Sequence, residues 1–295
     1  MLSVVLGCGY SGLRIARELA ADGEVVGTRR DAGGLAELAR GGVRGVALDG
    51  GVSAELAEVL GRATHLVSSV APARTPPLDD PMLDVVRPLV EGGALPALEW
   101  IGYLSTIGVY GDHGGGLVDE GTPCVSAQPR SIARLEAEAA WRALGERAGV
   151  PVAVLRLSGI YGPGRNAVRD ALAGRARVLI KAGQVFNRIH VDDLATATAL
   201  AARARFRGVL NVTDDEPAAP QDVIGHAHAL IGRAPPPAVP FDEADISPMA
   251  RSFYTESKRV ANGRSKSVLG LQYRYPDYRS GLASLVTGER VASGA

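Results

Sequence analysis

Short apolar runs alternate with amphipathic segments through the first third of the chain. After the run at residues 2–6, for example, Leu13, Ile15, Ala16 and Leu19 recur at helical spacing. This pattern predicts strands at residues 2–6, 24–28, 43–48, 64–70 and 98–105, with helices between them. Strands that alternate with helices form a parallel sheet with right-handed crossovers. The predicted fold class is therefore α/β, with a doubly wound parallel sheet.

The turn after the first strand carries the pattern Gly-x-Gly-x-x-Gly. In a Rossmann dinucleotide site the first glycine permits the turn, the second lets a pyrophosphate approach the backbone, and the third lets the helix pack on the strand. The free N–H groups of the helix start then face the phosphates. A tight turn in an unrelated α/β protein is the alternative interpretation. The predicted cofactor contacts here are Gly7, Cys8, Gly9, Tyr10, Ser11 and Gly12.

The end of the second strand indicates which dinucleotide is bound. An NAD site carries an acidic residue there for the ribose hydroxyls, whereas this chain has Thr28, Arg29 and Arg30. Arginine binds a 2′-phosphate, so NADP is predicted in preference to NAD; the alternative is a pair of solvated charges. Three further cofactor contacts are predicted at later strand ends, namely Asp49, Val70 and Ala71. A proline-rich loop is expected at Arg74–Pro81.

Composition restricts the classes of partner and compartment. The 295 residues contain 32 Lys+Arg and 32 Asp+Glu, so no basic excess points to nucleic acid or to an anionic membrane. No stretch is long and apolar enough to span a bilayer, and the first apolar run lacks the features of a signal peptide. Cys8 lies in the glycine turn and Cys124 stands alone, so we expect no disulfide and a cytoplasmic location. No metal site is predicted.

Five further motifs follow in order along the chain. They are Leu104–Gly111 with Asp119–Glu120, Arg156 with Tyr161–Gly164, His190–Ala195, Asn211–Val212, and Leu269–Gly270 with Gly281–Leu282. Together with the glycine turn they resemble the extended short-chain dehydrogenase/reductase family, the NAD-dependent epimerase/dehydratase-like proteins. This resemblance implies hydride transfer to or from a nicotinamide cofactor.

The resemblance also locates the catalytic positions. It places the family's substrate-orienting Ser/Thr at Thr106, its tyrosine at Arg130 and its lysine at Arg134. A guanidinium does not donate a proton at neutral pH, so the chain resembles atypical members without the Tyr-x-x-x-Lys pair. Arg134 would bond the nicotinamide ribose as well as serve the catalytic set. Three interpretations stay open: another acid acts (Tyr110, Tyr161, Tyr103, His190 or water), Arg130 clamps an anionic substrate, or the protein binds NADP without catalysis.

The resemblance implies two lobes: residues 1–163 with 189–215 for NADP binding, and 164–188 with 216–295 for substrate. We expect Asp192 or Asp193 to cap the helix at 190–203. The predicted function is an NADP-dependent oxidoreductase or epimerase/dehydratase-like protein for a small polar, anionic metabolite, and the alternative is a non-catalytic regulator. By analogy with the family, the helix at 130–144 is a candidate homodimer surface. Six predicted substrate contacts are Asn187, Arg188, Arg251, Tyr254, Lys258 and Asn262.

Overall fold

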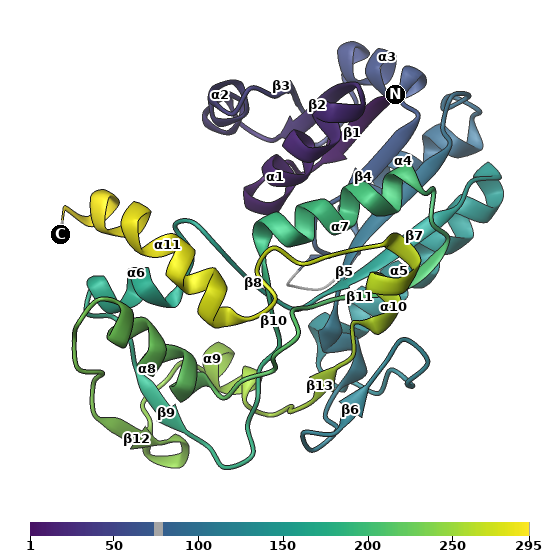
Figure 1. The fold of residues 1–295 in the computed structure, drawn as a ribbon. Helices are drawn as coiled ribbons and strands as arrows, with labels where there is room; N and C mark the ends of the chain where they lie inside the picture. The colour runs from purple at the N-terminus through teal and green to yellow at the C-terminus, as the bar shows by residue number, and fades with distance from the viewer. Residues whose placement is uncertain (74–78, 295) are drawn as a thin grey trace.

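The computed structural model describes residues 1–73 and 79–294, and it confirms the doubly wound α/β fold (Figure 1). The main sheet has seven strands in the order β11-β7-β5-β4-β1-β2-β3, and every neighbouring pair is parallel. Its strands are β1 (Leu2–Leu6), β2 (Glu24–Arg29), β3 (Arg44–Ala47), β4 (His65–Ser68), β5 (Trp100–Thr106), β7 (Val152–Leu157) and β11 (Gly208–Val212). The strand order reverses between β1 and β4, and ligands of such sheets bind beyond the strand ends at this point.

Helices cover both faces of this sheet, as the alternation of side chains along β1 requires. Val5 belongs to the core beneath one set of helices, whereas Val4 and Leu6 belong to the core beneath the other set. The first set is α1 (Tyr10–Leu19), α2 (Ala32–Arg40) and α7 (Val191–Arg203). The second set is α3 (Ala54–Arg62), α4 (Pro81–Glu91) and α5 (Pro129–Ala148). Small alanines on α7 let it pack closely against α1.

Several predicted boundaries shift by one or two residues: β3 spans 44–47 instead of 43–48, for example, and β4 spans 65–68 instead of 64–70. The fifth strand runs from Trp100 to Thr106, not from 98 to 105. Helix α4 begins at Pro81 because Asp80 caps it: the Asp80 carboxylate accepts the Met82 N–H at 2.9 Å. Of the expected loop at Arg74–Pro81, residues 74–78 lie outside the described residues.

The second lobe has its own apolar core. Side chains from α6, α8 and α11 meet there, including Val168, Val223 and Leu282. Figure 1 shows these helices grouped on one side of the molecule, next to the carboxyl ends of the sheet strands. The lobe contains β8 (Gly159–Tyr161), α6 (Ala167–Leu172), β9 (Val178–Ile180), β10 (Arg188–His190), α8 (Pro220–Leu230), β12 (Ala238–Pro240), α9 (Pro248–Phe253) and α11 (Tyr278–Ser293).

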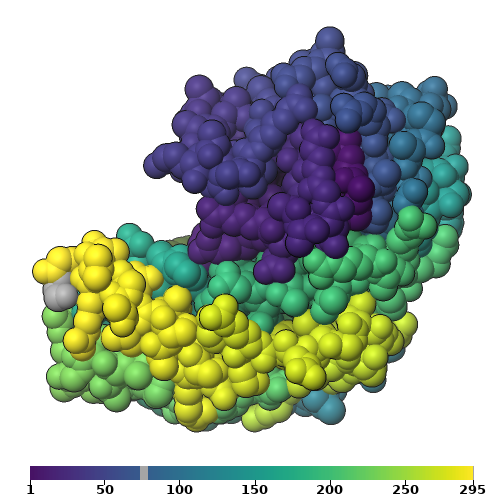
Figure 2. Space-filling view, turned by 45° about the horizontal axis from the view of Figure 1, so that its top comes forward, coloured from purple at the N-terminus to yellow at the C-terminus, as the bar shows by residue number. Residues whose placement is uncertain are grey.

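Part of the predicted substrate segment 216–295 returns to the main sheet and its helices. Strand β13 (Arg259–Val260) pairs with β6 (Leu117–Val118), and α10 (Gly263–Leu269) packs on β11 and α7. Figure 2 shows an open recess between the N-terminal segment and the C-terminal helix α11. Three short 3-10 helices complete the described elements: η1 (Ala20–Asp22), η2 (Ile107–Tyr110) and η3 (Phe241–Glu243). Within the described ranges, no helix has the length and apolar character that crossing a membrane requires.

Candidate functional site

The glycine turn couples β1 to its two neighbouring strands. Gly7 has a φ of +74°, and a Cβ on it would lie 2.2 Å from Cγ2 of Val70, so only glycine fits there. The Gly7 N–H donates to the Thr28 hydroxyl at 2.9 Å, and the Cys8 N–H donates to the Thr28 carbonyl at 2.9 Å. The predicted contact residues Val70 and Thr28 therefore hold the turn from either side.

The start of α1 is open in the way that a bound phosphate needs. Gly9 is the N-cap residue, and no side chain of the described chain caps this helix. The first helical bond runs from the Leu13 N–H to the Gly9 carbonyl, at 2.8 Å, which leaves the N–H groups of Tyr10, Ser11 and Gly12 outside the ladder. Free amides at the positive end of a helix dipole attract phosphate. The turn thus fits a dinucleotide.

Arg29 lies over this turn at the end of β2. Its Nη1 donates to the Cys8 carbonyl at 3.3 Å, and its Nη2 lies 2.5 Å from Oε2 of Glu37 on α2. Arg30 follows and is exposed. The nearest acid in sequence, Asp31, caps α2 by accepting the Gly34 N–H at 2.7 Å. Its carboxylate is therefore committed to the helix.

The other two predicted cofactor contacts follow strand ends at the same edge of the sheet. Asp49 is exposed shortly after β3, and Ala71 is exposed shortly after β4. Neither comes within the hydrogen-bond network of the glycine turn. Their contact with a cofactor stays a prediction.

Thr106 and Arg134 both lie near the end of β5. The Thr106 hydroxyl oxygen accepts the Gly108 N–H at 3.1 Å and so caps η2. This bond leaves the hydroxyl hydrogen available for an acceptor. Nη1 of Arg134 donates to the Leu104 carbonyl at 2.5 Å, and its buried Nε has no partner among the described residues. Thr106 is the last residue of β5 and Arg134 is bonded to Leu104 of the same strand, so both side chains lie near the strand end.

Arg130, one turn earlier on α5, faces the second lobe. Its Nη1 donates to the Ser252 hydroxyl at 2.9 Å, and its guanidinium carbon lies 4.5 Å from the centre of the Phe253 ring. The two residues belong to α9 and its C-terminal end. Arg130 is therefore the contact between α5 and α9, and it lies at the border between the lobes.

The candidate tyrosines are buried; the hydroxyls of Tyr110 and Tyr161 reach hydrogen-bond acceptors, whereas that of Tyr103 has no partner among the described residues. Tyr110 is 0% exposed and its hydroxyl donates to Oδ1 of Asn211 at 2.7 Å. The Tyr161 hydroxyl reaches the Asp277 carbonyl at 3.4 Å, and Tyr103 lies beneath Arg134. Burial raises the pKa of all three hydroxyls above the usual range for tyrosine. None of these geometries resembles an accessible proton donor, and that of Tyr110 fits packing.

His190 has a structural position at the start of α7. Its Nδ1 accepts the Asp192 N–H at 3.2 Å, so the imidazole itself caps the helix. The expectation that Asp192 or Asp193 would be the cap is wrong: Asp193 is buried and accepts the N–H groups of Arg274 and Tyr275. The cap is not recognisable from sequence because histidine is not a typical N-cap residue. Burial lowers the pKa of His190 to about 4, so the ring is neutral at pH 7.

A buried ion pair beneath the site was not predicted. Glu138 is 0% exposed, and it accepts from Arg156 at 3.1 and 2.8 Å and from the Ser105 hydroxyl at 2.5 Å. Arg156 also lies 4.9 Å from the centre of the Tyr110 ring. The pair joins β5, α5, β7 and η2 behind Thr106. The signal in the sequence is one arginine inside the apolar strand Val152–Leu157, but nothing local identifies its partner.

The predicted substrate residues have diverse surroundings. Both ends of the Asn187 amide are bonded to the backbone of Lys258 and Val260, and the buried Lys258 ammonium pairs with Glu256 at 2.9 Å. Asn262 bonds the carbonyls of residues 213 and 214. Arg251 and Tyr254 both pack on Phe241. Arg188 lines a cavity, which is described below.

Together the parallel sheet, the open glycine turn and the strand-end polar residues define a dinucleotide-binding α/β protein of Rossmann type. The chain belongs to the NAD dependent epimerase/dehydratase family, whose model matches residues 4–212. This membership confirms the resemblance inferred from the sequence motifs. It supports an NAD(P)-dependent oxidoreductase or epimerase-like role.

Three similar proteins illustrate the family. A functionally unknown conserved protein from Silicibacter pomeroyi is 41% identical with a TM-score of 0.86, over 97% of this chain and 98% of that one. The 3-diazoavenalumate denitrifying reductase of Streptomyces sp is 32% identical over 176 residues, which cover 56% of this chain but only 55% of the reductase. The Thermus thermophilus UDP-glucose 4-epimerase, solved with NAD, has 22% identity and a TM-score of 0.73 over 99% of this chain and all of that one, and it shows the fold alone.

Proposed function

We propose that the protein is an NADP-dependent oxidoreductase that acts on a small polar, anionic metabolite. The observation that carries the choice of cofactor is the end of β2. Two guanidinium groups follow one another there, and the acid next to them, Asp31, is committed as the cap of α2. Glu37 holds Arg29 against the glycine turn, so this arginine is already oriented before a nucleotide arrives. Such an arrangement favours a 2′-phosphate over free ribose hydroxyls.

In this proposal each group of residues has a separate role in binding the cofactor or the substrate. The amides of the glycine turn would hold the pyrophosphate, and the nicotinamide, when bound, supplies hydride chemistry. Thr106 donates its free hydroxyl hydrogen to the substrate oxygen, because its oxygen is already fixed by Gly108. Arg134 keeps the end of β5 in place through the Leu104 carbonyl and would bond the nicotinamide ribose. Arg130 would bind the anionic group of the substrate at the border of the lobes, in exchange for its bond to Ser252.

Nucleotide titrations of matched variants test the cofactor. Arg29→Ala should weaken NADPH binding by about 1–3 kcal/mol, since it removes charged hydrogen bonds, and should leave NADH binding nearly unchanged. Arg40→Ala is the control, because that exposed arginine on α2 bonds the Ala36 carbonyl and, within residues 1–73 and 79–294, no other group. Equal losses for NADPH and NADH, or tighter binding of NADH by the parent protein, would refute the NADP proposal. Tighter binding of NADH is a specific alternative, because the similar Thermus epimerase was solved with NAD.

A non-catalytic NADP-binding regulator is the second proposal. The observation in its favour is that Tyr103, Tyr110 and Tyr161 are buried, which agrees with the prediction from the sequence motifs that Arg130 stands at the position of the family's tyrosine. A screen of NADPH oxidation against carbonyl and nucleotide-sugar substrates separates the two. Turnover that Thr106→Val abolishes supports the enzyme. Tight NADPH binding with no consumption across the panel supports the regulator.

A further inference from the structure

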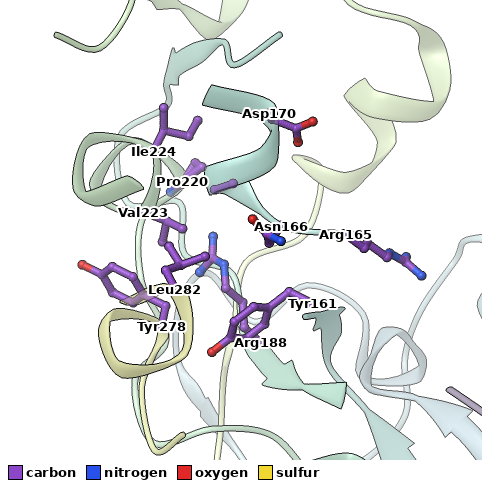
Figure 3. Close-up of a pocket in the computed structure, with 11 residues that line it drawn as sticks. Tyr161, Arg165, Asn166, Asp170, Arg188, Pro220, Val223, Ile224, Tyr278 and Leu282 are labelled. Atoms are coloured by element: carbon purple, nitrogen blue, oxygen red, sulfur yellow. The ribbon is translucent and has the colours of Figure 1, made fainter. Parts of the chain in front are cut away.

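A cavity of about 290 Å³ lies inside the second lobe, between β8, β10, α6, α8 and α11. Its walls are mainly apolar, with Val223 and Ile224 from α8 and Leu282 from α11. Tyr161 and Tyr278 add flat aromatic surfaces. Figure 3 shows the Arg188 side chain extending from β10 into the space between these groups. The cavity therefore combines apolar walls with two cationic groups, Arg188 between these walls and the solvent-exposed Arg165 at the rim.

The hydrogen bonds of Arg188 leave most of its guanidinium free. Nη1 donates to the Phe186 and Ala218 carbonyls at 3.0 and 3.2 Å, which fixes the side chain from one end. Among the described residues, no carboxylate forms an ion pair with this guanidinium, and neither Nε nor Nη2 has a hydrogen-bond partner. Burial lowers the pKa of Arg188, as expected for a charge withdrawn from water. A partly buried cation without a counter-ion is costly, so an anion that supplied one would bind favourably.

Two other polar side chains around the cavity, Asn166 and Asp170, already have hydrogen-bond or ion-pair partners within the protein. The Asn166 side chain donates to the Gly162 carbonyl and to Glu289, and it accepts the Arg169 N–H. Asp170, which also lines the cavity, is neutralised by an ion pair with Arg175 at 2.9 Å. Arg165, at the rim, is exposed to solvent. Arg188 is therefore the group that a ligand deep in the cavity would meet.

Asp214 is the carboxylate whose charge acts on the Arg188 guanidinium, but it forms no ion pair with it among the described residues. Burial raises its pKa to about 8, although the charge of Arg188 opposes this shift. Its carboxyl is therefore mainly protonated at pH 7. Its Oδ1 accepts the Glu216 N–H at 3.3 Å, and its Oδ2 has no partner among the described residues. The positive charge of Arg188 is left for an outside anion.

We propose that this cavity binds a small carboxylate that carries a flat apolar body, with the carboxylate on Arg188 and the apolar body between α8 and α11. One planar guanidinium matches one carboxylate in a two-bond fork. A phosphate dianion would find one arginine between the apolar walls, Arg188, and the second arginine, Arg165, only at the exposed rim. The volume lies at the small end for ligand sites, which suits a ligand the size of a single aromatic ring.

Fluorine NMR with 4-fluorobenzoate tests the proposal on the full chain without nucleotide, so the result is independent of the NADP assignment. The parent protein should bind the probe, and unlabelled benzoate should displace it whereas neutral benzamide should not. Arg188→Gln should weaken binding about tenfold or more, because charged hydrogen bonds are lost. Arg165→Gln at the rim is the matched control and should change the affinity by less than about threefold.

A second variant keeps the test decisive if Arg188→Gln does not fold. Ile224→Phe fills the cavity from α8 and leaves Arg188 in place, and it should also abolish binding of 4-fluorobenzoate. Circular dichroism of each variant confirms that it is folded. Three outcomes would overturn the proposal: equal binding of benzoate and benzamide, unchanged affinity in both variants, or displacement of the probe by inorganic phosphate at lower concentrations than by benzoate.

Discussion

Removing the negative charge of Glu138 tests whether the buried ion pair supports the end of β5. Glu138→Gln keeps the size of the side chain but leaves Arg156 charged at 6% exposure. In the folded protein burial opposes this charge, yet hydrogen bonds to Glu138 raise the pKa of Arg156 above its usual value. Arg156 stays ionised in the variant even without this carboxylate, because a guanidinium is not deprotonated in proteins. Its two bonds to the carboxylate would be replaced by at most one bond to a neutral amide oxygen.

The expected cost follows from the burial of both partners. Breaking a buried pair by removing one partner costs about 3–5 kcal/mol, because a charge stays behind without compensation. The Ser105 hydroxyl, which donates to the same carboxylate, adds to this loss. For a chain of this size the melting temperature should fall on the order of 10 °C. The effect is large because Glu138, Arg156 and Ser105 come from α5, β7 and β5, which the pair joins.

A double-mutant cycle in chemical denaturation measures the coupling. Arg156→Met alone should also destabilise, since it leaves Glu138 buried without a cation. The double variant Glu138→Gln/Arg156→Met should recover most of the loss, since it buries no unpaired charge. Arg147→Gln is the control, because its bond to Glu91 is exposed and should contribute below about 1 kcal/mol. A loss under about 1 kcal/mol for Glu138→Gln, or additive effects in the double variant, would refute the reasoning.

Two further predictions concern the glycine turn and a buried acid. Gly7→Ala should abolish nucleotide binding and lower the melting temperature, because its Cβ would meet Val70 at 2.2 Å with φ at +74°; unchanged NADPH affinity by calorimetry would contradict this. The folded protein binds the Asp214 proton more tightly than the unfolded chain does, so its contribution to stability is full below about pH 4 and is lost as the pH rises towards 8. The lowered pKa of His190 makes the free energy of unfolding rise with pH below about pH 6.5, which offsets the loss from Asp214 there. The free energy of unfolding should therefore decline between about pH 6.5 and 8, by up to about 1 kcal/mol per pH unit. Urea denaturation across that window should show the decline in the parent and not in Asp214→Asn, and identical slopes would exclude it.

The sheet could be predicted from the sequence because its determinants are local. Each strand of the first hundred residues is a short apolar run, and each helix repeats apolar residues on one face, so neither needs distant information. The glycine turn is equally local: Gly7 and Gly12 follow a strand and begin a helix, and the structure places them as the pattern indicates. What shifts is the position of some boundaries, for example at α4, which begins at Pro81 although the sequence assigns this residue to a loop.

The candidate site was harder to predict from the sequence, because its polar groups bond to partners far away along the chain. Glu138 and Arg156 are 18 residues apart, and Tyr110 meets Asn211 across 101 residues. A sequence shows which residues carry a charge or a hydroxyl, but not which of them form hydrogen bonds or ion pairs with one another. Asn187 and Lys258, for instance, were predicted to bind substrate by residue type, whereas their polar atoms hold β13 and its neighbouring segments together.

The same consideration explains why Arg188 differs from the other predicted substrate residues. Asn187, Lys258 and Asn262 have their polar atoms bonded to this chain's own backbone or acids, so binding a ligand would break existing bonds. Arg188 is held by two carbonyls at one nitrogen and presents the rest of its guanidinium to a cavity. A ligand there gains bonds without displacing any. A candidate binding residue in this lobe is therefore better identified by its unused hydrogen-bonding capacity than by its charge alone.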